Sequence, residues 1–272
     1  MEPGIRLELG RELKMTGRVT LITGASAGIG CELARIFARA GKRVALVARR
    51  AERLQVLADE IAAGGGERPI VIACDLRSPE ACKIIRAALA AEQVEVEYLA
   101  NNAGFGLFGE ATVLDRGEQL AMVDVNVRAL TELCFCFADQ VIAAKGGILN
   151  VASLAGFLPG PRMAVYYATK AYVLSFSEAL HAELGPKGVR VTALCPGPVP
   201  TEFQGLAGIK PGMDSTVLGV SPADVAQAGF DGLISGKRLV LPGLGMKIIP
   251  FLLRFVPRGV VLNLVSLVQS GR

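Results

Sequence analysis

Short apolar runs alternate with longer amphipathic stretches along most of the chain. The apolar, β-branched runs predict buried strands at residues 19–23, 43–47, 69–73, 94–100, 147–151, 190–195 and, more weakly, 238–241. The helical spacing of apolar positions predicts helices at residues 29–40, 51–63, 115–144 and 163–184. Two further helices are expected at Ser78-Pro79 and at Ser221-Pro222, because serine caps a helix and proline fits its first turn.

The order of these elements predicts an α/β fold. Strand and helix alternate throughout the 272 residues, and the strands are almost continuously apolar, as in a parallel sheet that helices cover on both faces. Right-handed crossovers would give a doubly wound, Rossmann-like sheet of about seven strands, with its ligand off the carboxyl ends of the strands. No linker or repeat divides the chain, so residues 1–272 are expected to form a single domain, with a polar leader at residues 1–17.

The composition narrows the classes of partner. Apolar residues make up 51% and charged residues 20% of the chain, which is typical of a globular protein. The formal net charge is only +4 and no basic tract is interleaved with aromatic residues, so no nucleic-acid partner is expected. No metal site is expected either, because the chain has one histidine, His181, and no CxxC pair among its six cysteines.

Cysteine usage and the first residues indicate the compartment. Most of the six cysteines are expected to be small buried hydrophobes in a reducing compartment. Cys134 and Cys136 would point to different faces of a helix. Residues 1–15 are charged and lack the apolar core of a signal peptide, so we expect a cytoplasmic protein.

A glycine-rich segment, Thr23–Gly30, connects the first strand to the first helix with the spacing GxxxGxG. Glycines there let the main chain approach a pyrophosphate closely, and the N–H groups of the helix N-terminus attract the anion. The segment is therefore interpreted as a dinucleotide-binding loop, and a purely structural turn is the alternative. The expected cofactor contacts in this loop are Gly24, Ser26, Gly28, Ile29 and Gly30.

Arg49 and Arg50 follow the second strand, and they bear on which nucleotide binds. An acidic residue at this point would hold the ribose hydroxyls, whereas arginine accommodates a 2′-phosphate. The first carboxylate is Glu52, so the two guanidinium groups favour NADP(H) over NAD(H). The alternative is that at least one arginine is a solvated residue at the start of a helix.

The ends of the third and fourth strands carry further candidates. Asp75, followed by Leu76, is placed to accept a hydrogen bond from an adenine amino group or, alternatively, to cap a helix. Asn101-Asn102-Ala103-Gly104 closes the fourth strand. Small residues there would leave room for the adenosine side of the cofactor, and the asparagines could tie neighbouring strand ends together. The expected cofactor contacts at these two ends are Asp75, Leu76, Asn102, Ala103 and Gly104.

Tyr166 and Lys170 lie one helical turn apart and would project from the same face. The ammonium group would favour the phenolate and lower the pKa of Tyr166, so that the phenol could exchange a proton. Such pairs also occur on solvated helices. Ser153, just past the fifth strand, could hold a carbonyl oxygen from a second direction. Asn126 interrupts an apolar stripe, either to hold a water beside the lysine or as a solvated or capping residue.

Together these separated motifs resemble the short-chain dehydrogenase/reductase family over about residues 17–204. The residues that carry the resemblance are Thr23–Gly30, Asp75, Asn101–Gly104, Asn126, Ser153, Tyr166 with Lys170, and Pro196-Gly197 with Thr201. The resemblance implies that Tyr166 is the general acid/base and that Lys170 lowers its pKa while binding the nicotinamide ribose. It also implies that Ser153 polarises the substrate carbonyl and that Asn126 maintains a water-linked proton relay. Three residues would border the nicotinamide: Pro196, Gly197 and Thr201.

Two positions depart from the family pattern. Ala27 stands where many NADP-using members have a basic residue, so the phosphate site would depend on Arg49 and Arg50. Tyr167 lies beside Tyr166 and is a rival for its role, but the YxxxK spacing of the family selects Tyr166.

We therefore expect an NADP(H)-dependent oxidoreductase that transfers a hydride between nicotinamide and the carbonyl or alcohol carbon of a small apolar molecule. An NAD-linked alcohol dehydrogenase is the alternative within the enzyme class. A nucleotide-binding regulator or scaffold without turnover is the alternative outside it. The complete Ser-Tyr-Lys-Asn set favours an enzyme, because a scaffold needs no proton donor.

The last third of the chain is the least regular. Residues 204–220 are glycine-rich and are expected to form a substrate flap. Residues 239–272 form an apolar C-terminal extension without a run long enough to span a bilayer. This extension could roof an apolar substrate pocket or pack in the interface of a homodimer or homotetramer. A third, less favoured interpretation lays it on a membrane surface, with Lys247, Arg254 and Arg258 at the headgroups.

Overall fold

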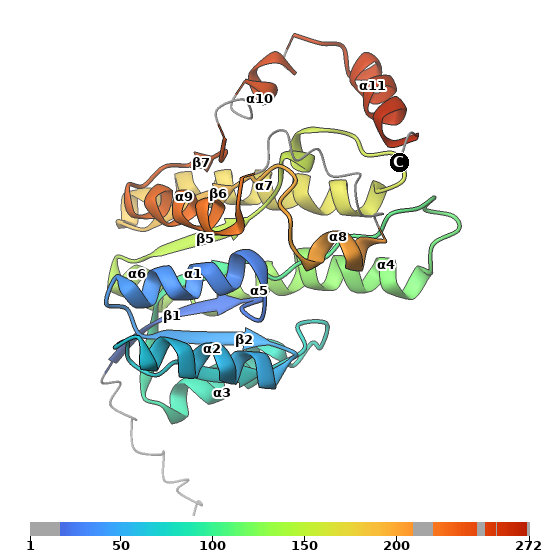
Figure 1. Ribbon diagram of the computed structural model, residues 1–272. Coiled ribbons are helices and arrows are strands. Elements are labelled where there is room, and N and C mark those ends of the chain that lie inside the picture. Colours follow the sequence, from blue (N-terminus) through green and yellow to red (C-terminus); the bar gives the residue numbers. More distant parts are fainter. Residues whose placement is uncertain (1–16, 209–219, 244–247, 254, 271–272) are drawn as a thin grey trace, which may run out of the picture.

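Seven parallel strands form one sheet in the computed structural model, which describes residues 17–208, 220–243, 248–253 and 255–270 (Figure 1). The strands are β1 (Gly17–Thr23), β2 (Val44–Ala48), β3 (Ile70–Ala73), β4 (Val94–Asn101), β5 (Gly147–Val151), β6 (Arg190–Leu194) and β7 (Leu239–Val240). Their order across the sheet is β3-β2-β1-β4-β5-β6-β7. The predicted doubly wound sheet is confirmed, and each strand end lies within two residues of its expected position.

Helices cover both faces of the sheet because each buries an apolar stripe against it. One face carries α1 (Gly28–Arg39), α2 (Ala51–Ala63) and α9 (Pro222–Ile234), and the other carries α3 (Ala81–Ala91), α5 (Leu130–Cys136) and α7 (Ala164–Leu184). Phe37 of α1 and Leu133 of α5 are among the largest fully buried side chains of these two layers. The sheet therefore separates two apolar cores, and the polar ends of its strands are left to form a site.

The long helix expected at residues 115–144 is divided into four segments. These are α4 (Arg116–Val123), the π-helical turn η1 (Asp124–Ala129), α5 and α6 (Ala138–Ala144). At Phe137, a buried side chain, the backbone leaves the helical conformation with φ −109° and ψ 4°. The helix expected to begin at Pro79 begins at Ala81, because the Ser78 hydroxyl accepts the N–H of Glu80 within a turn that precedes α3.

The strand order reverses at β1. From β1 the chain first builds β2 and β3 on one side, and then returns to add β4 to β7 on the other side. The loops that leave β1 and β4 therefore diverge, which opens a crevice beyond the carboxyl ends of the strands. This crevice lies where the sequence predicts the ligand.

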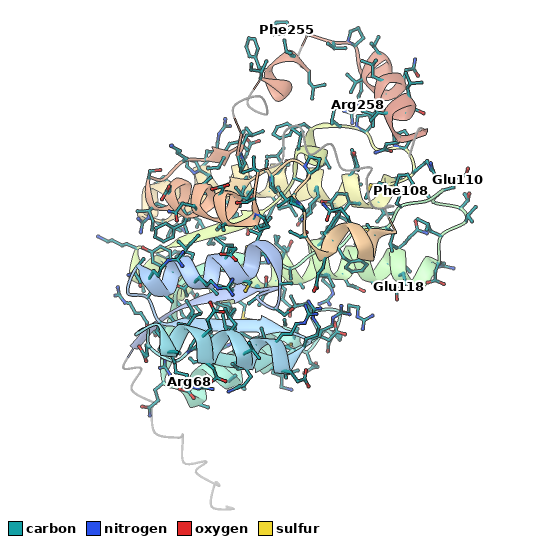
Figure 2. All side chains as sticks on the ribbon, viewed as in Figure 1. Arg68, Phe108, Glu110, Glu118, Phe255 and Arg258 are labelled. Carbon is teal, nitrogen blue, oxygen red and sulfur yellow. A yellow bond between two sulfur atoms is a disulfide. The ribbon has the colours of Figure 1, made fainter. Side chains whose placement is uncertain are left out.

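The C-terminal extension forms two helices outside the helical layers, α10 (Ile249–Leu252) and α11 (Arg258–Ser270) (Figure 1). Its outward surface is apolar, with Phe255 73% and Leu267 74% exposed. Phe255 and Arg258 lie in this segment, away from the sheet (Figure 2). Within the described residues, no helix combines the length and the hydrophobicity that crossing a bilayer requires. Most of the expected leader and flap, residues 1–16 and 209–219, lies outside the described residues, as do Lys247 and Arg254.

Cys82 of α3 and Cys136 of α5 form a disulfide. They meet because α3 and α5 belong to the same helical layer, although 54 positions separate them in the chain. No sequence motif predicts this pair. The other four cysteines are free; Cys74, Cys134 and Cys195 among them are buried, as expected for small hydrophobes.

Candidate active site

A cavity of about 710 Å³ occupies the crevice beyond the strand ends. The loops that follow β1 to β6 line it, so residues far apart in the sequence meet there. Every expected cofactor or catalytic residue reaches this cavity except Gly30 and Asn126, which lie directly behind its wall. Its lining includes the arginines that follow β2, which define one end, and Tyr166, which defines the other.

The glycine-rich loop is packed closely against the end of β4. Gly24 has a left-handed φ of +67°, and a Cβ atom at Gly30 would lie only 2.4 Å from the Asn102 side-chain nitrogen. That nitrogen donates to the main-chain oxygens of Thr23 at 2.9 Å and Gly24 at 3.2 Å. Gly30 therefore allows α1 to pack against the sheet, while Gly24 and Gly28 leave main-chain atoms open to the cavity.

Thr23, the first residue of the glycine-rich segment, has a hydrogen-bonding role that the sequence analysis did not assign to it. Its hydroxyl accepts hydrogen bonds from the N–H groups of Asn102 and Ala103, both at 3.0 Å. These bonds join the ends of β1 and β4, the two strands between which the order reverses. Threonine at the last position of a buried strand, directly before a glycine-rich turn, is the signal that could have identified it.

Positive charge gathers at one end of the cavity. Arg49 and Arg50 both line it, and the Arg50 guanidinium donates to the Ser26 hydroxyl at 3.1 Å. Arg50 also forms an ion pair of 2.9 Å with Glu202, at the start of α8 (Glu202–Ala207). Arg50 is thus a tethered residue and not merely a solvated one at a helix start. Glu202 is a residue that sequence reasoning missed, because the pair joins distant segments.

Asp75 faces the same cavity but already has a partner. Its carboxylate accepts the main-chain N–H of Arg77 at 3.0 Å and pairs with the Arg77 guanidinium at 2.7 Å. The Arg77 guanidinium holds the pKa of Asp75 below its ordinary value. Asp75 stabilises a turn and does not cap α3, which begins six positions later at Ala81. The proposed contact with adenine stays a prediction.

Tyr166 and Ser153 meet at the other end of the cavity. The Tyr166 ring is half-buried, and burial of the phenol raises its pKa from the ordinary value of 10.0 to about 12, an effect that a hydrogen bond with the Ser153 side chain partly opposes. The Ser153 hydroxyl also accepts the N–H of Ala155 at 3.1 Å, which fixes its position. Desolvation of the phenol is the largest contribution to this raised pKa, and the expected lowering by Lys170 stays a prediction.

Lys170 lies behind Tyr166 and is bound to the sheet. Its ammonium group donates to the main-chain oxygen of Val151 at 2.8 Å and lies 5.9 Å from the centre of the Tyr166 ring. The side chain is only 5% exposed, and this burial lowers the pKa of Lys170 to about 8. Burial therefore makes the positive charge of Lys170 energetically unfavourable. The charged group lies close to Tyr166 and faces the cavity.

Asn126 lies in the π-helical turn η1, so the expected local irregularity of the helix is present. Its amide nitrogen donates to the main-chain oxygen of Phe105 at 2.9 Å and to the Thr169 hydroxyl at 3.0 Å. Its amide oxygen accepts the N–H of Phe105 at 3.1 Å. The side chain is 1% exposed, so Asn126 is neither solvated nor a helix cap. It joins the loop after β4 to the residue that precedes Lys170.

Apolar side chains surround Tyr166. The Phe203 ring of α8 lies 5.2 Å from the Tyr166 ring, centre to centre. A Cβ atom at Gly106 would come within 2.8 Å of Phe203 and 3.1 Å of Tyr166, so this position tolerates only glycine without a shift. Other apolar residues that line the cavity include Phe105, Leu107, Leu154, Leu158, Met163 and Tyr167.

The C-terminal extension reaches the site through Tyr167. The side-chain nitrogen of Gln269, in α11, donates to the Tyr167 hydroxyl at 2.9 Å, and Arg162 donates to the main-chain oxygen of Gln269 at 3.1 Å. Gln269 is 1% exposed. No described residue of α10 or α11 lines the cavity itself, so α11 supports one wall from behind.

Comparison with known proteins agrees with this geometry. The family model described as short chain dehydrogenase matches residues 18–209. A short chain dehydrogenase of Pseudocercospora fijiensis (strain CIRAD86) is 37% identical over 195 residues, which cover 70% of this chain but only 62% of that relative. Sulfoacetaldehyde reductase of Chromohalobacter salexigens is 40% identical over 186 residues, 67% of this chain and 72% of that protein. The structure of a short-chain dehydrogenase from Sphingobium yanoikuyae in complex with NADPH superposes with a TM-score of 0.79 at 31% identity, covering 89% of this chain and 94% of that one.

Proposed function

This chain belongs to the short-chain dehydrogenase family, and from that premise we propose that it is an NADPH-dependent reductase of apolar ketones or aldehydes. One observation carries the proposal: a single cavity has Ser26, Arg49 and Arg50 at one end and Ser153, Tyr166 and Lys170 at the other. The first end suits a 2′-phosphate and the second a carbonyl oxygen.

The residues of the cavity fit a phosphorylated dinucleotide. Side chains at Gly24 and Gly30 would collide with Asn102, so the loop keeps its main chain at the cavity surface, where a pyrophosphate can approach it. Arg49 and Arg50 would hold the 2′-phosphate together with the Ser26 hydroxyl, which Arg50 already contacts. The NADPH that accompanies the structure from Sphingobium yanoikuyae supports this choice.

The side chains around Tyr166 provide the proton and position the substrate. Bound NADPH would supply the hydride that adds to the carbonyl carbon. Tyr166, whose raised pKa keeps it protonated at neutral pH, donates its proton to the carbonyl oxygen as negative charge develops there. The Ser153 hydroxyl donates to the same oxygen from a second direction. Lys170, charged below its pKa of about 8, favours the phenolate that remains.

Asn126 acts through Tyr166 and Lys170. By joining Phe105 to Thr169 it holds the loop after β4 against the helix that carries Tyr166 and Lys170. A proton that returns to Tyr166 from solvent would pass Lys170 and the polar groups of this turn. The Asn126 side chain is therefore a positioning residue for the relay that the family resemblance implies.

The substrate class follows from the walls around Tyr166. Apart from the Ser153 and Tyr166 hydroxyls and the Lys170 ammonium group, this end of the cavity is formed mainly by apolar side chains, including Phe105, Leu158 and Phe203. Apolar walls favour a substrate that carries its carbonyl on a hydrocarbon frame.

The absorbance of NADPH and of NADH, followed with the full-length protein against a panel of ketones, aldehydes and 3-oxoacyl compounds, tests the proposal. We expect oxidation of NADPH with the more apolar carbonyl compounds, and a kcat/KM for NADPH at least tenfold above that for NADH. Faster turnover with NADH, or with NAD and alcohols, would contradict the cofactor assignment. Tight nucleotide binding without turnover of any compound would instead support a regulatory role.

A further inference from the structure

The first two residues of α8 contact opposite ends of the cavity. Glu202 pairs with Arg50, at the end expected to hold the 2′-phosphate. Phe203, the next residue, lies with its ring 5.2 Å from that of Tyr166. Consecutive residues of one short helix thus connect the nucleotide end of the cavity to its reacting end.

The carboxylate of Glu202 is an internal anion that binds two arginines. One carboxylate oxygen pairs with Arg50 at 2.9 Å, and the other accepts a short hydrogen bond from Arg53. Hydrogen bonds from Arg53 and Arg50 lower the pKa of Glu202, so the group is a carboxylate at neutral pH. The same Arg50 nitrogen lies 3.1 Å from the Ser26 hydroxyl. A carboxylate oxygen therefore occupies the kind of position on a guanidinium that a phosphate oxygen takes.

The helix behind Glu202 is well tied at its N-terminus. Thr201 forms a capping box with Gln204, in which the main-chain N–H of Thr201 donates to the Gln204 side chain at 3.0 Å. The Thr201 methyl group also lies close to the glycine-rich loop, where a Cβ atom at Gly28 would come within 3.1 Å of it. Loss of the ion pair between Glu202 and Arg50 would therefore alter the position of α8, a helix that contacts both the glycine-rich loop and Tyr166.

We infer that Glu202 competes with the 2′-phosphate of the nucleotide for Arg50, so that a 2′-phosphorylated nucleotide loosens α8 whereas its 2′-hydroxyl counterpart does not. The inference rests on the proposed NADPH specificity. Glu202 is then a specificity-determining residue: it reduces the preference for NADPH over NADH, and it makes the position of Phe203 beside Tyr166 depend on which nucleotide is bound.

The expected change in affinity for a 2′-phosphate follows from the exposure of Arg50 and Glu202. The side chains of Arg50 and Glu202 are both 42% exposed, so water screens their attraction. Removal of such a competitor should strengthen binding of a 2′-phosphate about three- to fivefold. Because the competition concerns one phosphate only, binding of a nucleotide without it should not change.

Calorimetric titration of the full-length protein with adenosine 2′,5′-bisphosphate and with adenosine 5′-monophosphate tests this inference. We expect Glu202→Gln to bind the bisphosphate about three- to fivefold more tightly than the wild type, with equal affinity for the monophosphate. The matched control is Glu52→Gln, which removes a carboxylate from the first turn of α2 and should leave the ratio of the two affinities unchanged. The competition would be overturned if Glu202→Gln and the wild type had the same ratio of bisphosphate affinity to monophosphate affinity. It would also be overturned if Glu52→Gln raised this ratio as much as Glu202→Gln does.

Hydrogen exchange of wild-type residues 199–208 provides a test without substitution. The bisphosphate should speed exchange in this segment relative to the monophosphate, and equal exchange with the two nucleotides would overturn the inference. If the wild type instead bound the two nucleotides equally well, the proposed 2′-phosphate site would fail, and the competition with it. A wild type that prefers the bisphosphate, with no effect of Glu202→Gln, would refute the competition alone.

Discussion

The ammonium group of Lys170 donates a hydrogen bond of 2.8 Å to the main-chain oxygen of Val151, the last residue of β5. This bond fixes a buried lysine to the rim of the sheet, one helical turn from Tyr166. The same burial that places the charge near the Tyr166 ring also makes the charge costly. The end of the cavity near Tyr166 is thus built at the expense of stability, which can be measured.

The stability of the protein should depend on the titration of Lys170. Burial lowers the pKa of Lys170 to about 8, whereas in the unfolded chain it is near 10.4. Between these two values the unfolded chain binds a proton that the folded protein has lost, so the free energy of unfolding rises with pH. Relative to Lys170→Met, the wild type should gain about 2 kcal/mol between pH 7 and pH 9.5. Urea unfolding of both proteins across this range measures it, and a constant difference would show that Lys170 is not desolvated.

Replacement of Arg49 should change the choice of cofactor. Arg49→Ala removes a guanidinium that lines the nucleotide end of the cavity, and a lost charged hydrogen bond to a phosphate should weaken NADPH binding roughly 10- to 100-fold. NADH binding should be almost unaffected. Arg68→Ala is the control, because Arg68 pairs with Asp59 and lies away from the cavity (Figure 2). An equal loss of affinity for both cofactors in Arg49→Ala would refute the phosphate role.

Enlargement of Gly106 should impair turnover and spare the cofactor. A Cβ atom at this position would approach Phe203 to 2.8 Å and Tyr166 to 3.1 Å, so Gly106→Ala should displace the reacting side chains and lower kcat about tenfold. The affinity for NADPH, measured by fluorescence titration, should stay within about twofold. Gly205→Ala is the matched control in α8, since nothing lies within 4 Å of its Cβ position. Unchanged kcat in Gly106→Ala would show that Phe203 yields without disturbing Tyr166.

The attachment of α11 should depend on Gln269. Gln269→Ala removes the hydrogen bond of 2.9 Å to the Tyr167 hydroxyl and a side chain that is 1% exposed. We expect the free energy of local opening of α11 to fall by about 1 kcal/mol. Trypsin cleavage at Arg258 should then accelerate about fivefold. Asn263→Ala, at an exposed position of the same helix, should cleave at the wild-type rate. Equal rates in both variants would mean that Gln269 does not hold the helix.

The sheet and the composition of the site could be predicted from the sequence because they depend on local patterns. Buried parallel strands need continuous apolar runs, and such runs predicted the position of every strand of the sheet. The glycine-rich loop and the Tyr-x-x-x-Lys spacing are likewise short segments. Since parallel strands end at one edge of the sheet, it also follows that Arg49, Ser153 and Tyr166 share one cavity.

Other features depend on contacts between distant segments, which no local pattern carries. The pair of Arg50 with Glu202 and the disulfide of Cys82 with Cys136 are of this kind. The helix α11 escaped prediction because its apolar residues face outward, so the usual rule that apolar spacing marks the buried face does not apply to it. The pKa of Tyr166 could not be predicted either, because the burial that raises it is a property of the folded site.

Turnover by Tyr166→Phe, compared with Tyr167→Phe, tests the central claim most directly. The rings of the two tyrosines are only 6.1 Å apart, so each variant is a control for the other. With NADPH and a carbonyl compound that the wild type reduces, Tyr166→Phe should lose roughly two to four decades in kcat while binding NADPH as the wild type does. Tyr167→Phe should keep most of its activity. Retained turnover in Tyr166→Phe, with loss in Tyr167→Phe, would contradict the assignment of Tyr166 as the proton donor.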